Sequence, residues 1–257
     1  MHNLFNLHRC NCYICVASAG HTYNYKRSKY AMTEQEAIKA HLTTNYISQN
    51  GMTFISGLCG GLKDARKISG RHMDTGDKFP DNSKCSKDDN GPYFRGHLGS
   101  WLGTMGYLAL LDQIGKCYKP KSKAKITGSI SAIKKCLKYF TTLSDDEIDI
   151  IYALRNAFFH DYSIFNKYNG KNNFFHLGHH PTKPIVKAPA ENWDGNYNNV
   201  KLESQTWANL EAIGDLVEKI YEDLQQLALT NQLDIELDGG HEELFRRYIF
   251  VSSEKVK

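Results

Sequence analysis

Residues 144–161 read SDDEIDIIYALRNAFFHD, and this stretch decides which kind of fold the sequence predicts. Its first four residues form a capping box between Ser144 and Glu147, with three carboxylates at the positive end of a helix dipole. The pattern predicts an amphipathic helix that runs to about Asp161. At about 100° per residue, one sector of this helix collects the side chains of Ile148, Ile151, Tyr152, Leu154, Phe158, Phe159 and Tyr162.

Further helical patterns lie on both sides of this stretch. Thr33 and Glu36 form a second capping box, and residues 210–227 carry an apolar stripe with a period near 3.6. Only short extended pieces at 173–177 and 184–187, typical of one small hairpin, and a short strand at 248–251 interrupt the helices. The sequence therefore predicts an all-α fold, a helical bundle with a small β-hairpin or irregular insertion. The other expected helices cover about 54–68, 97–118, 127–140 and 204–230.

Shifts in composition divide the chain. We expect an N-terminal arm at residues 1–30, a helical domain at 31–230 and a C-terminal extension at 231–257. Polar residues rich in Gly, Asn, Asp and Pro mark insertions in the helical domain at about 70–96 and 163–201. Within the helix expected at 97–118, the glycines predict that another helix approaches closely; they are Gly99, Gly103 and Gly106.

Composition restricts the class of protein. Hydrophobic residues make up 41% of the 257 residues, which is enough for a sizeable core, and a net charge of +4 permits a polyanionic partner without requiring one. No apolar run approaches the roughly 18 residues of a membrane span. The seven scattered cysteines indicate free thiols in a reducing compartment. We therefore expect a cytoplasmic protein that does not associate with membranes.

The N-terminal arm leaves alternatives open. Residues 8–19 combine a basic start, a short apolar run and an Ala-Ser-Ala end, as a signal peptide does, but Asn11 interrupts the run. Met32 offers a second start codon just before the first helical pattern. Only one cysteine pair has zinc-site spacing, so an apolar arm is favoured and we expect neither a metal nor a cofactor. The residues that would form the zinc site are His8, Cys10, Cys12, Cys15 and His21.

The string RNAFFH at residues 155–160 carries the functional signal. Asn156 and His160 are four residues apart and share a helix face. Arg155 falls in the apolar sector, where an unpaired guanidinium is costly, so it must meet a carboxylate, a cavity, a ligand or a second subunit. On an ideal helix Arg155 and His160 point about 140° apart. A partner subunit, or a helix that unwinds near His160, would let them converge.

A second arginine and histidine have comparable spacing. Arg66 precedes His72, but no asparagine follows Arg66, and Gly70 lies between the two. We interpret this second pair as an accident of composition.

The RNAFFH string, late on an amphipathic helix, resembles the signature of HEPN ribonucleases. In that superfamily an Arg, often followed by Asn, Asp or His, precedes a His by a few residues. Type VI CRISPR effectors and many abortive-infection and toxin proteins carry it. The resemblance covers this string and a helical context at about 33–230, without the insertions. It implies a HEPN-like helical bundle and a symmetric or pseudo-symmetric homodimer whose two motifs face one groove.

The resemblance further implies a metal-independent endoribonuclease. RNA carries its own nucleophile, the 2′-hydroxyl. His160 would act as general base or acid, Arg155 would stabilise negative charge on the phosphate, and Asn156 would orient His160 or hold a phosphate oxygen. The products would carry 2′,3′-cyclic phosphate and 5′-hydroxyl ends. Residues expected to bind the substrate are Phe159 or Tyr162, which would stack a base, and Lys121 and Lys123, in a basic linker beside a helix end.

The implied partners are RNA, a second copy of the chain, and an antitoxin protein or RNA. A role as a toxin or in phage defence rests on the resemblance alone. Two alternatives remain: a catalytically inactive HEPN-like module that binds RNA or nucleotides or dimerises, and an unrelated helical regulator in which Arg155 pairs with an acid such as Asp161. The chain also has a histidine-rich segment, which we interpret as a solvated loop and not as a metal or phosphate site. Its histidines are His176, His179 and His180.

Overall fold

The computed structural model describes residues 32–47, 53–79 and 100–252. The chain divides into two compact units, residues 1–32 and 33–257, and nearly all described residues belong to the second. The signal-peptide and zinc-site alternatives for the arm lie outside the described residues. Within the described ranges, no helix is long and apolar enough to cross a membrane.

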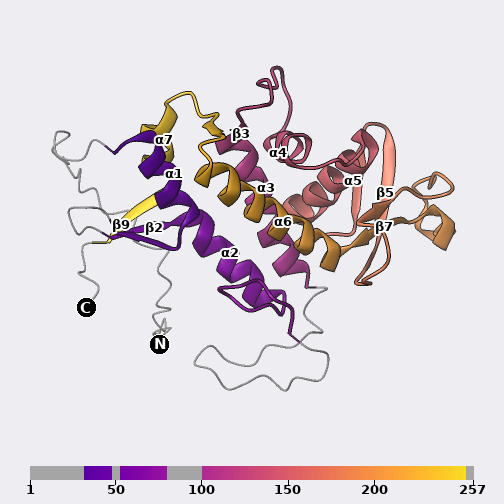
Figure 1. Ribbon diagram of the computed structural model, residues 1–257. Helices are drawn as coiled ribbons and strands as arrows, with labels where there is room; N and C mark the ends of the chain where they lie inside the picture. The colour runs from indigo at the N-terminus through magenta and orange to yellow at the C-terminus, as the bar shows by residue number, and fades with distance from the viewer. Residues whose placement is uncertain (1–31, 48–52, 80–99, 253–257) are drawn as a thin grey trace, which may run out of the picture. The chain divides into compact units, whose positions relative to one another are not determined.

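The prediction of an all-α fold is wrong, because the described residues form three β-sheets in addition to the helices (Figure 1). Most of the strands have two to four residues, which is too short for a period-two pattern, and most of them pair with distant segments. The three sheets are β1 (Asn45–Ile47), β2 (Thr53–Ser56) and β9 (Ile249–Ser252); β3 (Tyr118–Pro120) and β8 (Leu233–Ile235); and β4 (Phe165–Tyr168), β5 (Lys171–Gly178), β7 (Thr206–Asn209) and β6 (Val186–Lys187).

The observed helices agree better with the sequence-based prediction than the observed strands do. Both predicted capping boxes, at Thr33 and Ser144, are present. Two expected helices begin late because strands β2 and β7 occupy their first residues. The sequence did not indicate α7. The α-helices of the described chain are α1 (Glu34–Leu42), α2 (Gly57–Ile68), α3 (Trp101–Cys117), α4 (Ala132–Phe140), α5 (Asp145–Asn156), α6 (Leu210–Leu229) and α7 (Gly240–Tyr248).

Helix α3 is the centre of the helical core and contacts α2, α4 and α6. Its glycines allow the close approach that the sequence predicts. A Cβ at Gly106 would lie 2.9 Å from the Cβ of Ala65 on α2. A Cβ at Gly115 would overlap the carbonyl oxygen of Ala132 and lie 2.7 Å from the backbone nitrogen of Cys136, both on α4. Gly106 therefore lets α2 pack closely on α3, and Gly115 does the same for α4.

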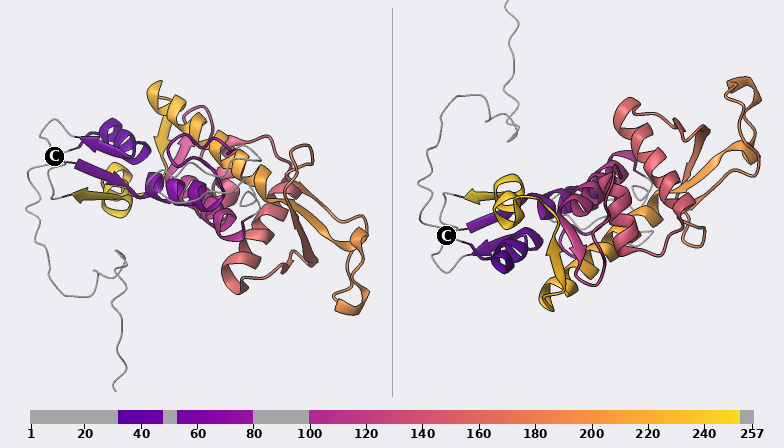
Figure 2. Two further views of the ribbon diagram at one scale, coloured as in Figure 1. Left: turned by 90° about the horizontal axis from the view of Figure 1, so that it is seen from below. Right: turned by 90° about the horizontal axis from the view of Figure 1, so that it is seen from above.

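The four-stranded sheet packs against α5. Strands β4 and β5 form a hairpin whose turn residues, Asn169 and Gly170, both have positive φ (50° and 75°), as a type I′ turn requires. The first predicted extended piece is part of β5, but β5 pairs with β4 and, in parallel, with β7, and not with the second piece. Figure 2 shows this sheet at one end of the unit, with β2 and β9 at the other.

A polar network around His41 is buried where α1 meets α3 and β3. The His41 ring is fully buried, with Nδ1 2.7 Å from Tyr118 Oη and Nε2 3.0 Å from Gln113 Nε2. An amide nitrogen only donates, so Nε2 accepts, and the ring proton lies on Nδ1 and is donated to Tyr118. Burial lowers the pKa of His41 to about 3.

We expect the protein to lose stability as the pH falls from about 6.5 towards 3, because the unfolded chain then gains a proton on His41 that the folded chain does not take up. This stabilisation is fully present above the pKa of His41 in the unfolded chain. It is lost as the pH falls towards the lower pKa of His41 in the folded chain. The loss would reach about 3–5 kcal/mol. Urea unfolding at a series of pH values should give a shallower dependence for His41→Gln than for the wild type. Parallel profiles would contradict this role of His41.

Candidate functional site

The RNAFFH string spans the point where α5 changes into a π-helix. The α-helix ends at Asn156, and the π-helical turn η2 (Ala157–Asp161) follows directly. A π-helix bonds residue i to residue i+5, so each residue turns by less than in an α-helix. The angle between Arg155 and His160 is therefore smaller than the about 140° of a straight α-helix. Such π-helical turns occur frequently at functional sites.

Arg155 meets a carboxylate, one of the partners that the sequence predicts for it. Its Nε donates to Asp112 Oδ2 on α3 at 2.8 Å, and its Nη1 donates to Asn156 Oδ1 at 3.3 Å. The guanidinium carbon lies 4.8 Å from the centre of the Phe159 ring. Asn156 thus contacts Arg155 in the structure, and Asp161, the acid suggested by the sequence, is not the partner. The Arg155 side chain remains 25% exposed.

Asp112 fixes Arg155 at a junction of three helices. While its Oδ2 accepts from Arg155, its Oδ1 accepts from the backbone N–H of Ile133 at 3.2 Å. The carboxylate therefore connects α3 with the first turn of α4, whose backbone N–H groups have no partner within the helix. The result is that the guanidinium of Arg155 is held in one place beside α4.

The residues after Phe158 are open to solvent. His160 and Asp161 are exposed, and within the described part of the chain the His160 ring makes neither a hydrogen bond nor an ion pair. Phe159 is 37% exposed and Tyr162 53% exposed, so both expected stacking residues have accessible surface. Tyr162 ends the turn in the left-handed conformation, with φ 47°.

Trp101 supports this turn from the start of α3. Its ring stacks on Phe158, with centres 5.3 Å apart and planes 17° apart, and its centre lies 5.5 Å from that of Tyr162. Phe158 itself is buried. This stack supports the exposed end of the RNAFFH string from the half-buried Trp101 and the buried Phe158.

The two predicted lysines are not brought to the motif by any described contact. Lys121 Nζ donates to Asn231 Oδ1 at 3.1 Å, and Lys123 Nζ donates to the carbonyl oxygen of Lys138 at 3.1 Å. Both are exposed and lie in the turn after β3. Their contribution to RNA binding stays a prediction.

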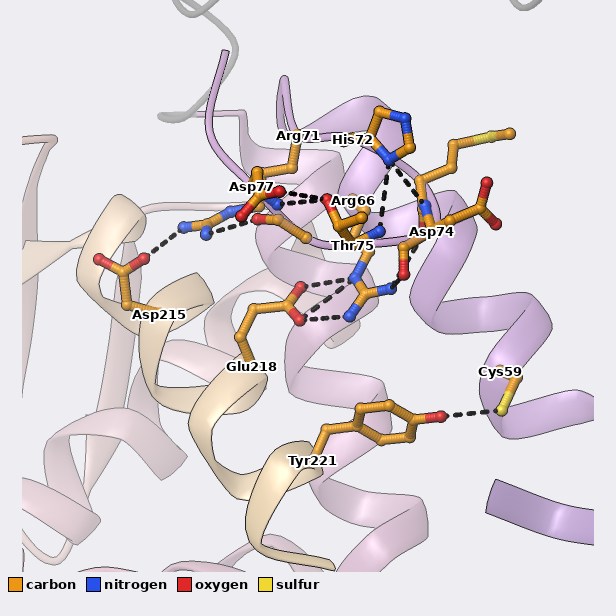
Figure 3. Close-up of polar contacts among 12 residues, drawn as sticks. Cys59, Arg66, Arg71, His72, Asp74, Thr75, Asp77, Asp215, Glu218 and Tyr221 are labelled. Atoms are coloured by element: carbon orange, nitrogen blue, oxygen red, sulfur yellow. Dashed lines mark hydrogen bonds and ion pairs between the residues drawn. The ribbon is translucent and has the colours of Figure 1, made fainter. Parts of the chain in front are cut away.

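The other arginine–histidine pair lies between α2 and α6 and is part of a set of internal ion pairs (Figure 3). Arg66 Nε and Nη2 donate to the Glu218 carboxylate at 2.6–3.2 Å, and the two side chains are only 8% and 13% exposed. Arg66 Nη1 donates to the carbonyl oxygens of Met73 and Asp74. His72 Nδ1 accepts from the backbone in the same loop.

The two arginines differ in how many N–H donors are already used. A guanidinium has five. Arg66 uses its Nε–H, both Nη1–H groups and one Nη2–H, which is four of the five. Arg155 uses its Nε–H and one Nη1–H, which is two of the five among the described residues. Arg66 therefore ties a loop to α6, whereas three N–H donors of Arg155 have no partner among the described residues.

The histidine-rich feature shows no metal-site geometry. Across residues 32–47, 53–79 and 100–252, no group of three or more His, Cys, Asp or Glu side chains is placed to hold a metal ion. His176 packs on Trp207, with ring centres 5.1 Å apart, and the backbone N–H of His180 donates to Asn209. The cysteines of the described chain are free and buried, as expected for a protein with free thiols; they are Cys59, Cys117 and Cys136.

Asp112 and Trp101 are the two site residues that the sequence analysis missed. Asp112 is the only acidic residue of the largely apolar α3, and this is the signal that could have identified it as a partner for Arg155. Trp101 gave no comparable signal, since an aromatic residue at a helix start is ordinary core material.

Compared with models of known protein families, with curated proteins and with solved structures, the chain shows no match in any of the three.

Proposed function

We propose that this chain is an endoribonuclease that cleaves RNA through attack by the RNA's own 2′-hydroxyl, without a metal ion. His160 takes the proton from the 2′-hydroxyl as the oxygen attacks phosphorus. Arg155 stabilises the negative charge that gathers on the phosphate oxygens. The 5′-oxygen leaves with a proton from solvent, so the products carry 2′,3′-cyclic phosphate and 5′-hydroxyl ends.

One observation carries this proposal: three of the five N–H donors of Arg155 have no partner among the described residues, and His160 is exposed in the π-helical turn that follows directly on the same helix. Asp112 and Asn156 fix the guanidinium, which lowers the entropy lost on binding phosphate. The exposed faces of Phe159 and Tyr162 flank the histidine and suit unpaired bases. Because single-stranded RNA has such bases, we propose it as the substrate.

The resemblance to HEPN ribonucleases rests on the RNAFFH string and its helix, and not on an all-α fold. From it come three further proposals: a homodimer with two motifs at one groove, an antitoxin partner, and a role as a toxin or in phage defence. Light scattering on the purified chain tests the first of these. A dimer is expected, and a monomer that cleaves RNA would refute the paired arrangement.

A second function is binding of RNA or nucleotides without cleavage. The observation that favours it is the Arg155–Asp112 ion pair, because a guanidinium already paired with a carboxylate attracts phosphate less strongly. Under this reading, RNA would bind at the same surface and remain intact.

An RNA cleavage assay in EDTA separates the two functions. We expect the purified chain to cut single-stranded RNA, to leave cyclic phosphate ends, and to leave the same RNA intact when every 2′-hydroxyl is methylated. Cleavage of the methylated RNA would contradict the proposed chemistry. Binding without cleavage of either RNA would favour the second function.

A further inference from the structure

A pocket of about 340 Å³ lies between α4, α5 and the tip of the β4–β5 hairpin. Its volume is at the lower end of the range for small-ligand sites. The hairpin tip is fixed over α5 because Asn169 Nδ2 donates to Asp149 Oδ2 at 3.1 Å. The walls are therefore built by three separate elements, which the chain holds together with side-chain contacts.

Two tyrosines and a lysine form the inner wall of this pocket. The rings of Tyr152 and Tyr168 meet edge to face, with centres 5.0 Å apart. Lys134 Nζ lies 4.9 Å and 4.6 Å from the two ring centres and donates to Tyr168 Oη at 2.6 Å. It also pairs with Asp149. Burial alone would lower the pKa of Lys134, but its bonds to Asp149 and Tyr168 raise it, so the lysine stays charged.

The pocket offers polar groups without a net charge. Lys134 and Lys138 pair with Asp149 and Asp145, so the charges of the wall balance. Ser131 also lines the pocket, but its Oγ is buried from solvent and has no hydrogen-bond partner among the described residues. A bare phosphate would have to displace a carboxylate from one of the lysines. A neutral, flat ligand with hydrogen-bonding edges fits these walls better.

The pocket is lined by residues of α5, the helix that also carries Arg155 and Asn156. Tyr152 lines it, and Asn156 is four residues further on, so the two share one face of α5. A rise of about 1.5 Å per residue separates them by about 6 Å along the axis. His160 follows after one further turn. A chain of RNA bound along this face would reach the pocket with a nucleotide next to the one that is cut.

We propose that the pocket binds the nucleobase of a nucleotide adjacent to the cleaved phosphodiester, with the base against Tyr168 and Tyr152. This inference rests on the proposed ribonuclease function, since it assigns one subsite of that substrate. The ligand is an unpaired nucleobase of RNA, because only an unstacked base can enter a pocket of this kind.

Binding of a short single-stranded RNA with 2′-O-methyl groups, which cannot be cut by the proposed chemistry, tests the pocket separately from cleavage. We expect Tyr168→Ala to raise the Kd about tenfold, and Tyr168→Phe to leave it within about twofold because the ring is kept. Ser129→Phe, at the exposed rim, should also raise the Kd about tenfold by filling the pocket without disturbing the core. Tyr197→Ala is the matched control, since Tyr197 is 64% exposed and lies outside the pocket.

Fluorescence anisotropy gives the Kd, and urea unfolding confirms that each variant is folded. Equal affinities for the wild type, Tyr168→Ala and Ser129→Phe would overturn the pocket assignment, whatever the cleavage assay shows. The same holds if the wild type does not bind the methylated RNA. Weak binding by both pocket variants, together with an unchanged Tyr197→Ala, would support it even if the chain cuts no RNA.

Discussion

Replacing Arg155 with alanine should lower the rate of RNA cleavage by about two to three orders of magnitude, because it removes the donors that stabilise the transition state. The cost in folding stability should be small, about 1 kcal/mol. The Arg155–Asp112 pair is about one-quarter exposed on both sides, and such pairs contribute little. Asp112 also keeps its hydrogen bond from Ile133. The measurement is initial cleavage rate together with urea unfolding.

The same substitution at Arg246 provides the control. Arg246 is an exposed arginine on α7 that pairs with Glu242 at 3.1 Å on the same helix. Arg246→Ala should leave the cleavage rate within about twofold and stability within about 0.5 kcal/mol. If Arg155→Ala unfolds the chain, or if it cuts RNA as fast as Arg246→Ala does, Arg155 is a structural residue.

For the ion pair between Arg66 and Glu218, by contrast, the large expected effect is on folding stability. Glu218→Gln should destabilise the fold by about 3–5 kcal/mol, because it leaves the buried Arg66 guanidinium without its carboxylate. The Glu218 side chain also accepts a hydrogen bond from Tyr107 Oη at 2.9 Å. Figure 3 shows Glu218 directed at Arg66 from α6. Thermal or urea unfolding measures the loss directly.

Glu222→Gln on the same helix is the matched control for this variant. Glu222 is exposed, and its substitution should change stability by no more than about 0.5 kcal/mol. If the two variants are equally stable, the Arg66–Glu218 pair does not hold the loop to α6. The interpretation of Arg66 and His72 as an accident of composition would then be in question.

Local signals in the sequence were sufficient for the helix that carries the site. Ser144 and Glu147 fix where α5 begins, and the capping box is present as predicted. The position of Arg155 in the apolar sector correctly required a partner. The identity of that partner could not be read from the sequence, because Asp112 lies 43 positions away and meets Arg155 only through the packing of α3 against α4 and α5.

The β-sheets could not be predicted from the sequence, for a different reason. Strands such as β2 and β9 have four residues each and are stabilised by pairing across most of the chain, so neither has a periodic signal of its own. The hairpin around Asn169 did have a local signal, an Asn-Gly pair between extended segments. This pair could have predicted the hairpin, whose tip closes the pocket beside Tyr168.

The most direct test of the catalytic assignment compares the two histidines that follow an arginine. His160→Gln and His72→Gln should be assayed side by side for cleavage of single-stranded RNA in EDTA, with the wild type as reference. His160 makes no described hydrogen bond, so its replacement should not affect folding. We expect His160→Gln to lose at least about a hundredfold in rate and His72→Gln to keep the wild-type rate. Undiminished cleavage by His160→Gln, or loss of cleavage in a folded His72→Gln protein alone, would contradict the assignment of His160 as the catalytic residue.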